Sequence, residues 1–178
     1  DVLRLADRIV FPGVGAIRGC MAGLREQGLH ELIPELMAQK PMLGICIAMQ
    51  ALCAFSEENG GVACLDVFDA NVRFFGDHLR DAKTGEVLKV PHMGWNQVQQ
   101  TQAHPIWEGI AQDSHFYFVH SYHVEPNLAE TVGQCKYGHP FSAVIAKDNI
   151  VATQFHPEKS ASAGLRLLKN FCSWDGQS

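Results

Sequence analysis

The sequence predicts an α/β protein whose open, mixed and largely parallel sheet is flanked by helices, with a β-rich middle section. Three observations predict this class. Residues 9–39 have the pattern of a short apolar strand, a glycine-containing loop and a helix. Residues 42–54 repeat the step from apolar strand to helix, an order typical of a parallel sheet. Short β-rich runs separated by Gly, Pro, Asn and Asp then dominate from about residue 70 to 155.

The first elements follow from apolar spacing. The stretch DRIVFPGVGA predicts a buried strand over 9–11 that breaks into a loop. The stretch RGCMAGLREQGLHELIPELMAQ predicts a helix over 18–39, because its apolar residues recur at roughly helical intervals. In KPMLGICIAMQALCAF, residues 40–55, an apolar strand bounded by Pro41 gives way at Cys46 to a helical pattern that continues to Ala54.

The later elements are mostly strands. The β-rich runs are DANVRFF (69–75), EVLKV (86–90), GWNQVQQ (94–100), HFYFVHSYHV (115–124), TVGQCKYG (131–138), FSAVIAK (141–147) and IVATQF (150–155). A closing helix is expected in SASAGLRLLKNFCSW, residues 160–174, with Ser160 or Ser162 as its N-cap. Its expected buried face consists of Leu165, Leu168, Phe171 and Cys172.

Length and composition exclude several classes of protein. A chain of 178 residues with 47% hydrophobic residues predicts a single domain over 1–178. A net charge of -5 without a basic cluster argues against nucleic acid as a partner. No apolar run approaches the roughly 20 residues that cross a bilayer, and DVLRLADRIV lacks the features of a signal peptide, so we expect a cytoplasmic protein without a membrane partner.

Six cysteines are scattered without a C-x-x-C pair, so neither a disulfide framework nor a metal site is expected. Five of them are interpreted as small core residues: Cys20, Cys53, Cys64, Cys135 and Cys172.

Cys46 stands apart because it falls on the predicted strand-to-helix turn. Such a turn requires small residues two positions before and after it, and here they are Gly44 and Ala48. The N-terminus of the following helix lowers the pKa of a thiol, so the placement predicts a thiolate nucleophile. An inert buried cysteine is the alternative that this stretch alone leaves open.

The stretch ATQFHPEKS supplies a base for that nucleophile. Pro157 forces His156 into an extended conformation, in which residues two apart point the same way. Glu158 can therefore accept the second N–H of the imidazole and hold it in one tautomer. We interpret His156 as the catalytic base and acid, and Glu158 as the residue that orients it.

Attack on a carbonyl also requires donors for the developing oxyanion. One is the backbone N–H of Ile47, the residue after the nucleophile. The other is expected from PGVGA, residues 12–16, where Gly13 and Gly15 let the backbone approach a ligand at the end of a strand. A plain turn remains the alternative for this loop.

Together, GICIAMQ (44–50) and the HPE of ATQFHPEKS resemble the class I, triad-type glutamine amidotransferases. Three further stretches, PGVGA, VPHMGWN (90–96) and FYFVHSYHV (116–124), resemble the glutaminase subunits of imidazole glycerol phosphate synthases. The similarity covers essentially the whole chain. Members of the family normally begin with a strand, a helix and a strand ahead of the segment aligned with Asp1, so the resemblance predicts a domain that is N-terminally incomplete.

The resemblance implies hydrolysis of glutamine to glutamate and ammonia through a cysteine thioester, without a cofactor. It assigns Cys46, His156 and Glu158 to catalysis. It leaves His120 open between a binding role and a packed strand-end histidine. The residues expected to bind the substrate are Gly13, Val14, Gly15, Ile47, Gln50, Ser121 and Tyr122.

The resemblance also implies a partner, a separate cyclase subunit with a (β/α)₈ barrel that forms a heterodimer with this chain and consumes the ammonia in histidine biosynthesis. Aromatic and Met residues are enriched at interfaces, so VPHMGWN is interpreted as the contact, with a buried turn as the alternative. The contact residues are Pro91, His92, Met93, Gly94 and Trp95. Two other functions stay open: another triad-type amidotransferase, or a weakened scaffold, since Ala48 stands where the family has glycine.

Overall fold

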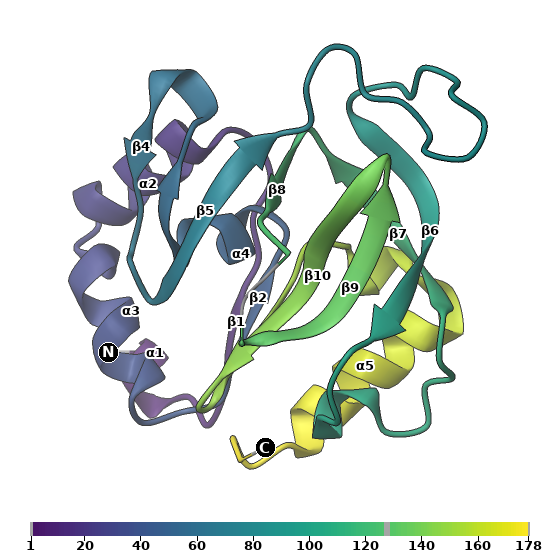
Figure 1. Ribbon diagram of the computed structural model, residues 1–178. Coiled ribbons are helices and arrows are strands. Elements are labelled where there is room, and N and C mark those ends of the chain that lie inside the picture. Colours follow the sequence, from purple (N-terminus) through teal and green to yellow (C-terminus); the bar gives the residue numbers. More distant parts are fainter. Residues whose placement is uncertain (1, 127–128, 178) are drawn as a thin grey trace.

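The computed structural model describes residues 2–126 and 129–177, in which strands form one curled sheet with helices on both sides (Figure 1). The elements in chain order are α1 (Val2–Leu5), β1 (Ile9–Phe11), α2 (Ile17–Glu26), α3 (Leu29–Met37), β2 (Met42–Ile45), α4 (Ile47–Ala51), β3 (Cys53–Ser56), η1 (Glu58–Gly60), β4 (Val62–Ala63), β5 (Phe68–Phe74), β6 (His92–Gln100), η2 (Pro105–Trp107), β7 (Ser114–His120), β8 (Tyr122–Val124), β9 (Thr131–Tyr137), β10 (His139–Lys147), β11 (Ile150–Thr153), η3 (Pro157–Lys159) and α5 (Ala161–Ser173).

The sheet is mixed, as the sequence predicts. Its main path runs β1-β2-β11-β10-β8-β5-β3-β4, and β6 joins β7 to β9. Parallel pairing is confined to β1 with β2, β2 with β11, and β3 with β5, and the other pairs are antiparallel. The expectation of a largely parallel sheet is therefore wrong, because short connections in the β-rich section favour antiparallel neighbours.

Two hydrophobic cores lie on the two faces of this sheet. One core includes Met42 of β2 and lies between the sheet and helices α2 and α3. The other includes Leu43 of β2 and lies between the sheet and α5. Successive strand side chains point to opposite faces, so β2 contributes to both cores and all four of its residues are buried. This central strand ends at Cys46, which places the thiol at the carboxyl end of the parallel part of the sheet.

Two predicted helices differ from the observed ones. The expected helix over 18–39 is divided into α2 and α3, because Gly28 adopts a left-handed φ of 66° between them. The helix expected to reach Ala54 ends at Ala51, and β3 begins at Cys53, since pairing with β5 outweighs the helical spacing. EVLKV forms no strand, apart from an isolated bridge between Val87 and Arg80.

The closing helix α5 is present, but its buried face is shifted by one position. Gly164, Leu167 and Phe171 are buried, whereas Leu165 is 64% exposed. Cys172 is also exposed, contrary to its interpretation as a core residue. All six cysteines are free thiols, and Cys20 and Cys64 are only partly buried. Within the described ranges, no helix is long and apolar enough to cross a membrane.

Candidate active site

Cys46 lies on a sharp turn between β2 and α4, so the predicted elbow is confirmed. Its φ of 57° and ψ of -109° lie outside the conformations that side chains favour, a strain typical of functional positions. Two backbone hydrogen bonds hold the turn: Cys46 N–H donates to Thr153 O at 2.8 Å, and Met49 N–H donates to Cys46 O at 3.0 Å. A Cβ on Gly44 would approach the Ala152 Cβ to 3.1 Å, so this position favours glycine.

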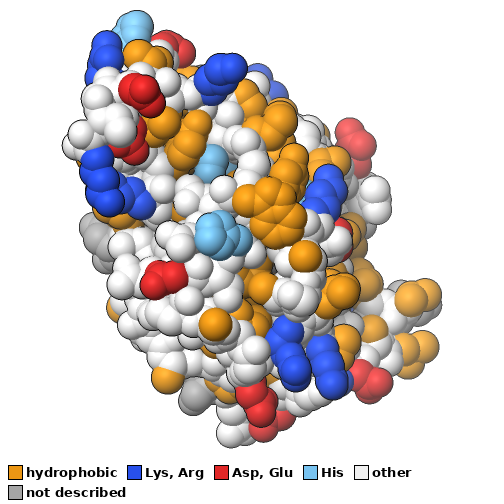
Figure 2. Space-filling view, turned by 90° about the vertical axis from the view of Figure 1, so that its right-hand side faces the viewer, with side chains coloured by type: hydrophobic (Ala, Val, Ile, Leu, Met, Phe, Trp, Pro, Cys, Tyr) orange, Lys and Arg blue, Asp and Glu red, His pale blue; other side chains and the backbone are white. Residues whose placement is uncertain are grey.

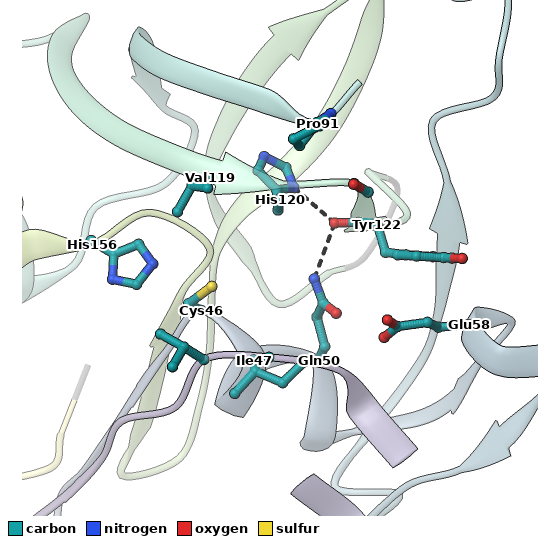
Figure 3. A pocket seen from close by; sticks show the side chains of 12 residues that line it. Cys46, Ile47, Gln50, Glu58, Pro91, Val119, His120, Tyr122 and His156 are labelled. Carbon is teal, nitrogen blue, oxygen red and sulfur yellow. Dashed lines mark hydrogen bonds between the residues drawn. The ribbon is translucent and has the colours of Figure 1, made fainter. Parts of the chain in front are cut away.

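His156 and Glu158 form the imidazole–carboxylate pair that the sequence predicts. His156 Nδ1 lies 2.7 Å from Glu158 Oε1; the His156 side chain is 3% exposed and that of Glu158 46%. The other ring nitrogen, Nε2, is buried and has no partner among the described residues. Figure 3 shows the imidazole turned toward the Cys46 sulfur.

The turn that carries this pair is held from β7 and α5. His156 N–H donates to Tyr117 O at 2.9 Å. Ser160 Oγ accepts from Tyr117 N–H at 3.0 Å and donates to His156 O. Ser160 occupies the N-cap position of α5, as expected, but its hydroxyl makes these bonds instead of capping the helix.

The thiol of Cys46 differs electrostatically from the sequence-based expectation. Burial raises its pKa to about 11, and the Glu158 carboxylate adds to the effect, whereas hydrogen bonding by Ile47 N–H and the Gln154 amide opposes it. The expected resting thiolate is therefore wrong, because desolvation exceeds the effect of a helix only five residues long. The thiol must lose its proton when it reacts.

Two buried amides connect this thiol to the rest of the site. Gln50 Nε2 donates to Tyr122 O and to Gln154 Oε1, both at 3.0 Å. Because Gln154 Oε1 accepts this bond, the Gln154 Nε2 faces the Cys46 sulfur, and the two atoms are 3.9 Å apart. Gln154 is fully buried, and sequence reasoning missed it because a polar residue at a strand end carries no distinctive pattern.

These groups open onto a cavity of about 460 Å³. Figure 3 shows Cys46 and His156 at one end of it and Glu58 with the Tyr122 ring at the other. The cavity is lined by Val14, Gly15, Cys46, Ile47, Gln50, Glu58, Pro91, Val119, His120, Ser121, Tyr122 and His156.

The cavity thus brings together most of the expected substrate-binding residues. Gly13 is not among the lining residues. It packs against the Ile47 side chain, and a Cβ added at Gly13 would come within 2.3 Å of the Ile47 Cγ2 atom. The loop therefore reaches the cavity through Val14 and Gly15, while Gly13 allows its close approach to the elbow.

Glu58 is a lining residue that sequence reasoning missed. Its Oε2 accepts from the N–H of Ile17 at the start of α2, at 2.9 Å, which leaves the other oxygen free to meet a ligand. The stretch SEENGG gave no signal beyond that of a polar loop. Val119 was also missed, and His120, left open from the sequence, lines the cavity while being 6% exposed.

The VPHMGWN segment has both buried and exposed residues. Met93 is 62% and Trp95 52% exposed on β6. Figure 2 shows the side of the molecule on which β6 lies in Figure 1, with apolar side chains among charged ones. Pro91 lines the same cavity as Cys46 and His156. His92 is only 3% exposed because its side chain faces the core, yet it lines a second cavity together with Met93 and Trp95, so its contact role stays a prediction. Among the described residues, no group of three His, Cys, Asp or Glu could hold a metal ion.

Comparisons with known proteins agree with this geometry. The family model for glutamine amidotransferase class-I matches residues 3–173. Imidazole glycerol phosphate synthase subunit HisH 1 of Pseudomonas aeruginosa is 54% identical over 99% of this chain and 82% of its own length. The corresponding HisH of Acinetobacter baylyi is 55% identical over 96% of this chain and 80% of its own. The chain belongs to the HisH family of class I glutamine amidotransferases.

Solved structures share the HisH-like fold at low sequence identity. A putative GMP synthase component from Thermoplasma acidophilum has a TM-score of 0.66 at 20% identity, over 97% of this chain and 74% of that one. The glutaminase domain of Trypanosoma brucei CTPS has a TM-score of 0.61 at 17% identity, over 98% and 74%. These likenesses show that the fold is that of class I amidotransferases, as the sequence predicts.

Proposed function

We propose that Cys46, His156 and Glu158 hydrolyse the side-chain amide of glutamine to glutamate and ammonia. The observation that carries the proposal is the Nε2 of His156, which has no partner in the described part of the chain and belongs to a ring that lines the same cavity as the strained Cys46, while Glu158 holds Nδ1. A nucleophile, a base and a group that orients the base define this type of catalysis.

The reaction begins from a thiol, because burial raises the Cys46 pKa to about 11. His156 Nε2 takes the S–H proton as sulfur attacks the amide carbon of glutamine, and Glu158 stabilises the imidazolium. The same proton passes to the amide nitrogen as its bond to carbon breaks. The nitrogen leaves as ammonia, and the carbon remains bound to the Cys46 sulfur as a thioester. Water, deprotonated by His156, then attacks the thioester carbon and releases glutamate, and the proton returns to sulfur.

The polar end of the cavity suits the amino-acid end of glutamine. Glu58 offers a carboxylate oxygen to the α-ammonium group. Ser121 and the Gln50 amide offer polar contacts to the α-carboxylate and amide groups. The oxyanion can accept a hydrogen bond from the N–H of Ile47, and Val14 and Gly15 bring loop backbone into the lining of the same cavity.

We further infer that the ammonia passes to a cyclase subunit in a cytoplasmic heterodimer that makes imidazole glycerol phosphate. The relatives are named as subunits of that synthase, and the resemblance implies a (β/α)₈ barrel. Exposed Met93 and Trp95 lie just past Pro91, which lines the cavity, so a partner docked there would cover its rim. The free cysteines fit a reducing compartment.

Glutamate release by the purified chain, with and without the cyclase subunit, tests the proposal. We expect turnover with the partner, loss of that turnover in Cys46→Ala, and no change in Cys172→Ala, which removes an exposed thiol that does not line the cavity. A glutamine analogue with an electrophilic carbon at the amide position should label Cys46 alone. No glutamate release by the complex, or equal release by Cys46→Ala, would overturn the assignment.

A further inference from the structure

Two buried histidines, His92 and His120, lie outside the catalytic pair yet touch the glutamine cavity through one continuous set of hydrogen bonds. Neither is exposed by more than 6%. His92 stacks on Phe118 and Tyr137, with ring centroids 4.9 Å and 4.0 Å away. Packing alone does not explain their polar contacts, because every ring nitrogen of both residues has a partner.

The contacts form a continuous series of hydrogen bonds from Asn96 in β6 to the cavity. Asn96 Nδ2 lies 3.2 Å from His92 Nε2, and His92 Nδ1 lies 3.0 Å from His120 Nε2. His120 Nδ1 lies 2.7 Å from the backbone oxygen of Tyr122. That oxygen also accepts from Gln50 Nε2 at 3.0 Å, and both bonds are drawn in Figure 3.

The groups at the two ends of this hydrogen-bond series determine which atom donates in each bond. The Tyr122 carbonyl can only accept, so His120 must carry its proton on Nδ1. At the other end Asn96 Nδ2 also donates to the Lys136 carbonyl at 3.0 Å, so the amide presents an N–H and not an oxygen to His92 Nε2. Both constraints require the same arrangement, in which Asn96 donates to His92 and His92 Nδ1–H donates to His120.

This hydrogen-bond series also requires that the His92 and His120 imidazoles each carry only one N–H proton. Burial lowers the pKa of His92 to about 4 and that of His120 to about 3. Both imidazoles are therefore neutral at physiological pH, and each has one donor and one acceptor nitrogen. Reversal of one bond would set two acceptors or two donors against each other at the next.

We propose that His92 and His120 are positioning residues of the glutaminase site, which form a one-directional hydrogen-bond relay from Asn96 to the Tyr122 carbonyl. The relay holds the bend between β7 and β8, where Ser121 and Tyr122 line the cavity. It also fills one of the two acceptor positions of the oxygen on which the Gln50 amide depends. The relay therefore governs glutamine binding more than the chemical step, and it rests on the proposed glutaminase function.

The outer end of the relay lies at the surface that we assign to the partner. Asn96 follows exposed Trp95 in β6, and a second cavity of about 410 Å³ is lined by Asn96, His92 and Trp95 together with residues of the loop before β6. A partner group that competed for the Asn96 amide would disturb the donor on which every later bond depends. Docking and glutamine binding are thus connected through identified atoms.

Nitrogen-15 NMR of the histidine side chains in the intact chain tests the relay without any activity. The Nδ1 and Nε2 shifts distinguish the two neutral tautomers, and we expect both His92 and His120 to be protonated on Nδ1. Asn96→Asp replaces the donor with an acceptor, so we expect the His92 proton to move to Nε2. Gln97→Glu is the matched control, since it adds the same charge at the next, exposed position of β6 and leaves the tautomers unchanged. An Nε2 proton on either histidine in the parent chain overturns the relay.

Kinetics of the complex then test its role. Asn and Leu have similar shapes, but only Asn can place an N–H where His120 Nδ1 lies. We expect His120→Leu to raise the KM for glutamine about tenfold with kcat changed less than about threefold, and His120→Asn to restore most of the loss. Equal effects of the two variants, or a fall in kcat alone, overturn the positioning role. Absence of turnover in the parent complex would instead refute the proposed function, while the NMR result would still decide the relay.

Discussion

Gly164 of α5 allows the catalytic turn to lie where it does, and Gly164→Ala is the sharpest test of that packing. A Cβ at this position would lie 2.0 Å from Pro157 O, 2.8 Å from Pro157 C and 2.7 Å from the Ser160 Cβ. Cβ contacts below 3.0 Å essentially do not occur, so the backbone of the turn and the helix must separate by at least 1 Å. Pro157 stands between His156 and Glu158, so the displacement reaches both members of the proposed catalytic pair.

The size of the effect follows from this displacement. Overpacking of a buried contact costs about 1–3 kcal/mol, which lowers the melting temperature of a chain of this size by about 2–12 °C. A shift of about 1 Å in a catalytic group costs about 10²-fold in rate. We therefore expect Gly164→Ala to lose about 10²-fold in kcat/KM with the cyclase subunit present, beyond any loss of folded protein at the assay temperature.

The assay combines thermal unfolding with glutaminase kinetics of the complex. Gly19→Ala is the matched control, because Gly19 is exposed in α2 and an added Cβ there meets no atom within 4 Å. Alanine at that position should stabilise the helix by about 0.5–1 kcal/mol without changing the rate. A Gly164→Ala variant with the melting temperature and kcat/KM of the parent would refute the reasoning.

Four further outcomes are expected at the site. Cys46→Ala should abolish glutamine hydrolysis while circular dichroism and partner binding stay unchanged, because the change removes the thiol with little volume; measurable turnover would contradict it. Glu158→Gln should lower kcat about 10²-fold yet retain activity, since Gln can still accept from His156 Nδ1–H, and a loss as complete as that of Cys46→Ala would assign the carboxylate another role. Ala48→Gly should leave turnover unchanged or raise it, because it removes a methyl group beside the strained elbow, and a large loss of kcat would show that the methyl is needed. Alkylation of Cys46 in the isolated chain, followed by mass spectrometry, should accelerate about tenfold per pH unit from pH 7 to 10, since only the thiolate reacts and burial raises its pKa to about 11; a plateau below pH 9 would show that the thiol is already ionised.

Local patterns predicted the geometry of the elbow and of the His156–Glu158 pair, because both arrangements depend on near neighbours in the chain. The elbow requires small residues beside Cys46, and the HPE segment sets His156 and Glu158 two positions apart, so both arrangements are readable from spacing. Helix ends were less predictable. Gly28 divides a region of continuous apolar spacing, and β3 replaces the end of the expected helix, because sheet pairing with a distant strand decides the outcome.

The sequence by itself determined the family, the elbow at Cys46 and the pairing of His156 with Glu158, since each depends on residue types at short separations. The tertiary structure alone decided which distant polar groups meet at the cavity, among them Glu58 and Gln154. It also decided the protonation of the site: the thiol pKa is raised because of what covers Cys46, not because of the residues beside it in the chain. Desolvation and hydrogen-bond partners depend on burial by strands far apart in sequence, so no local pattern carries them.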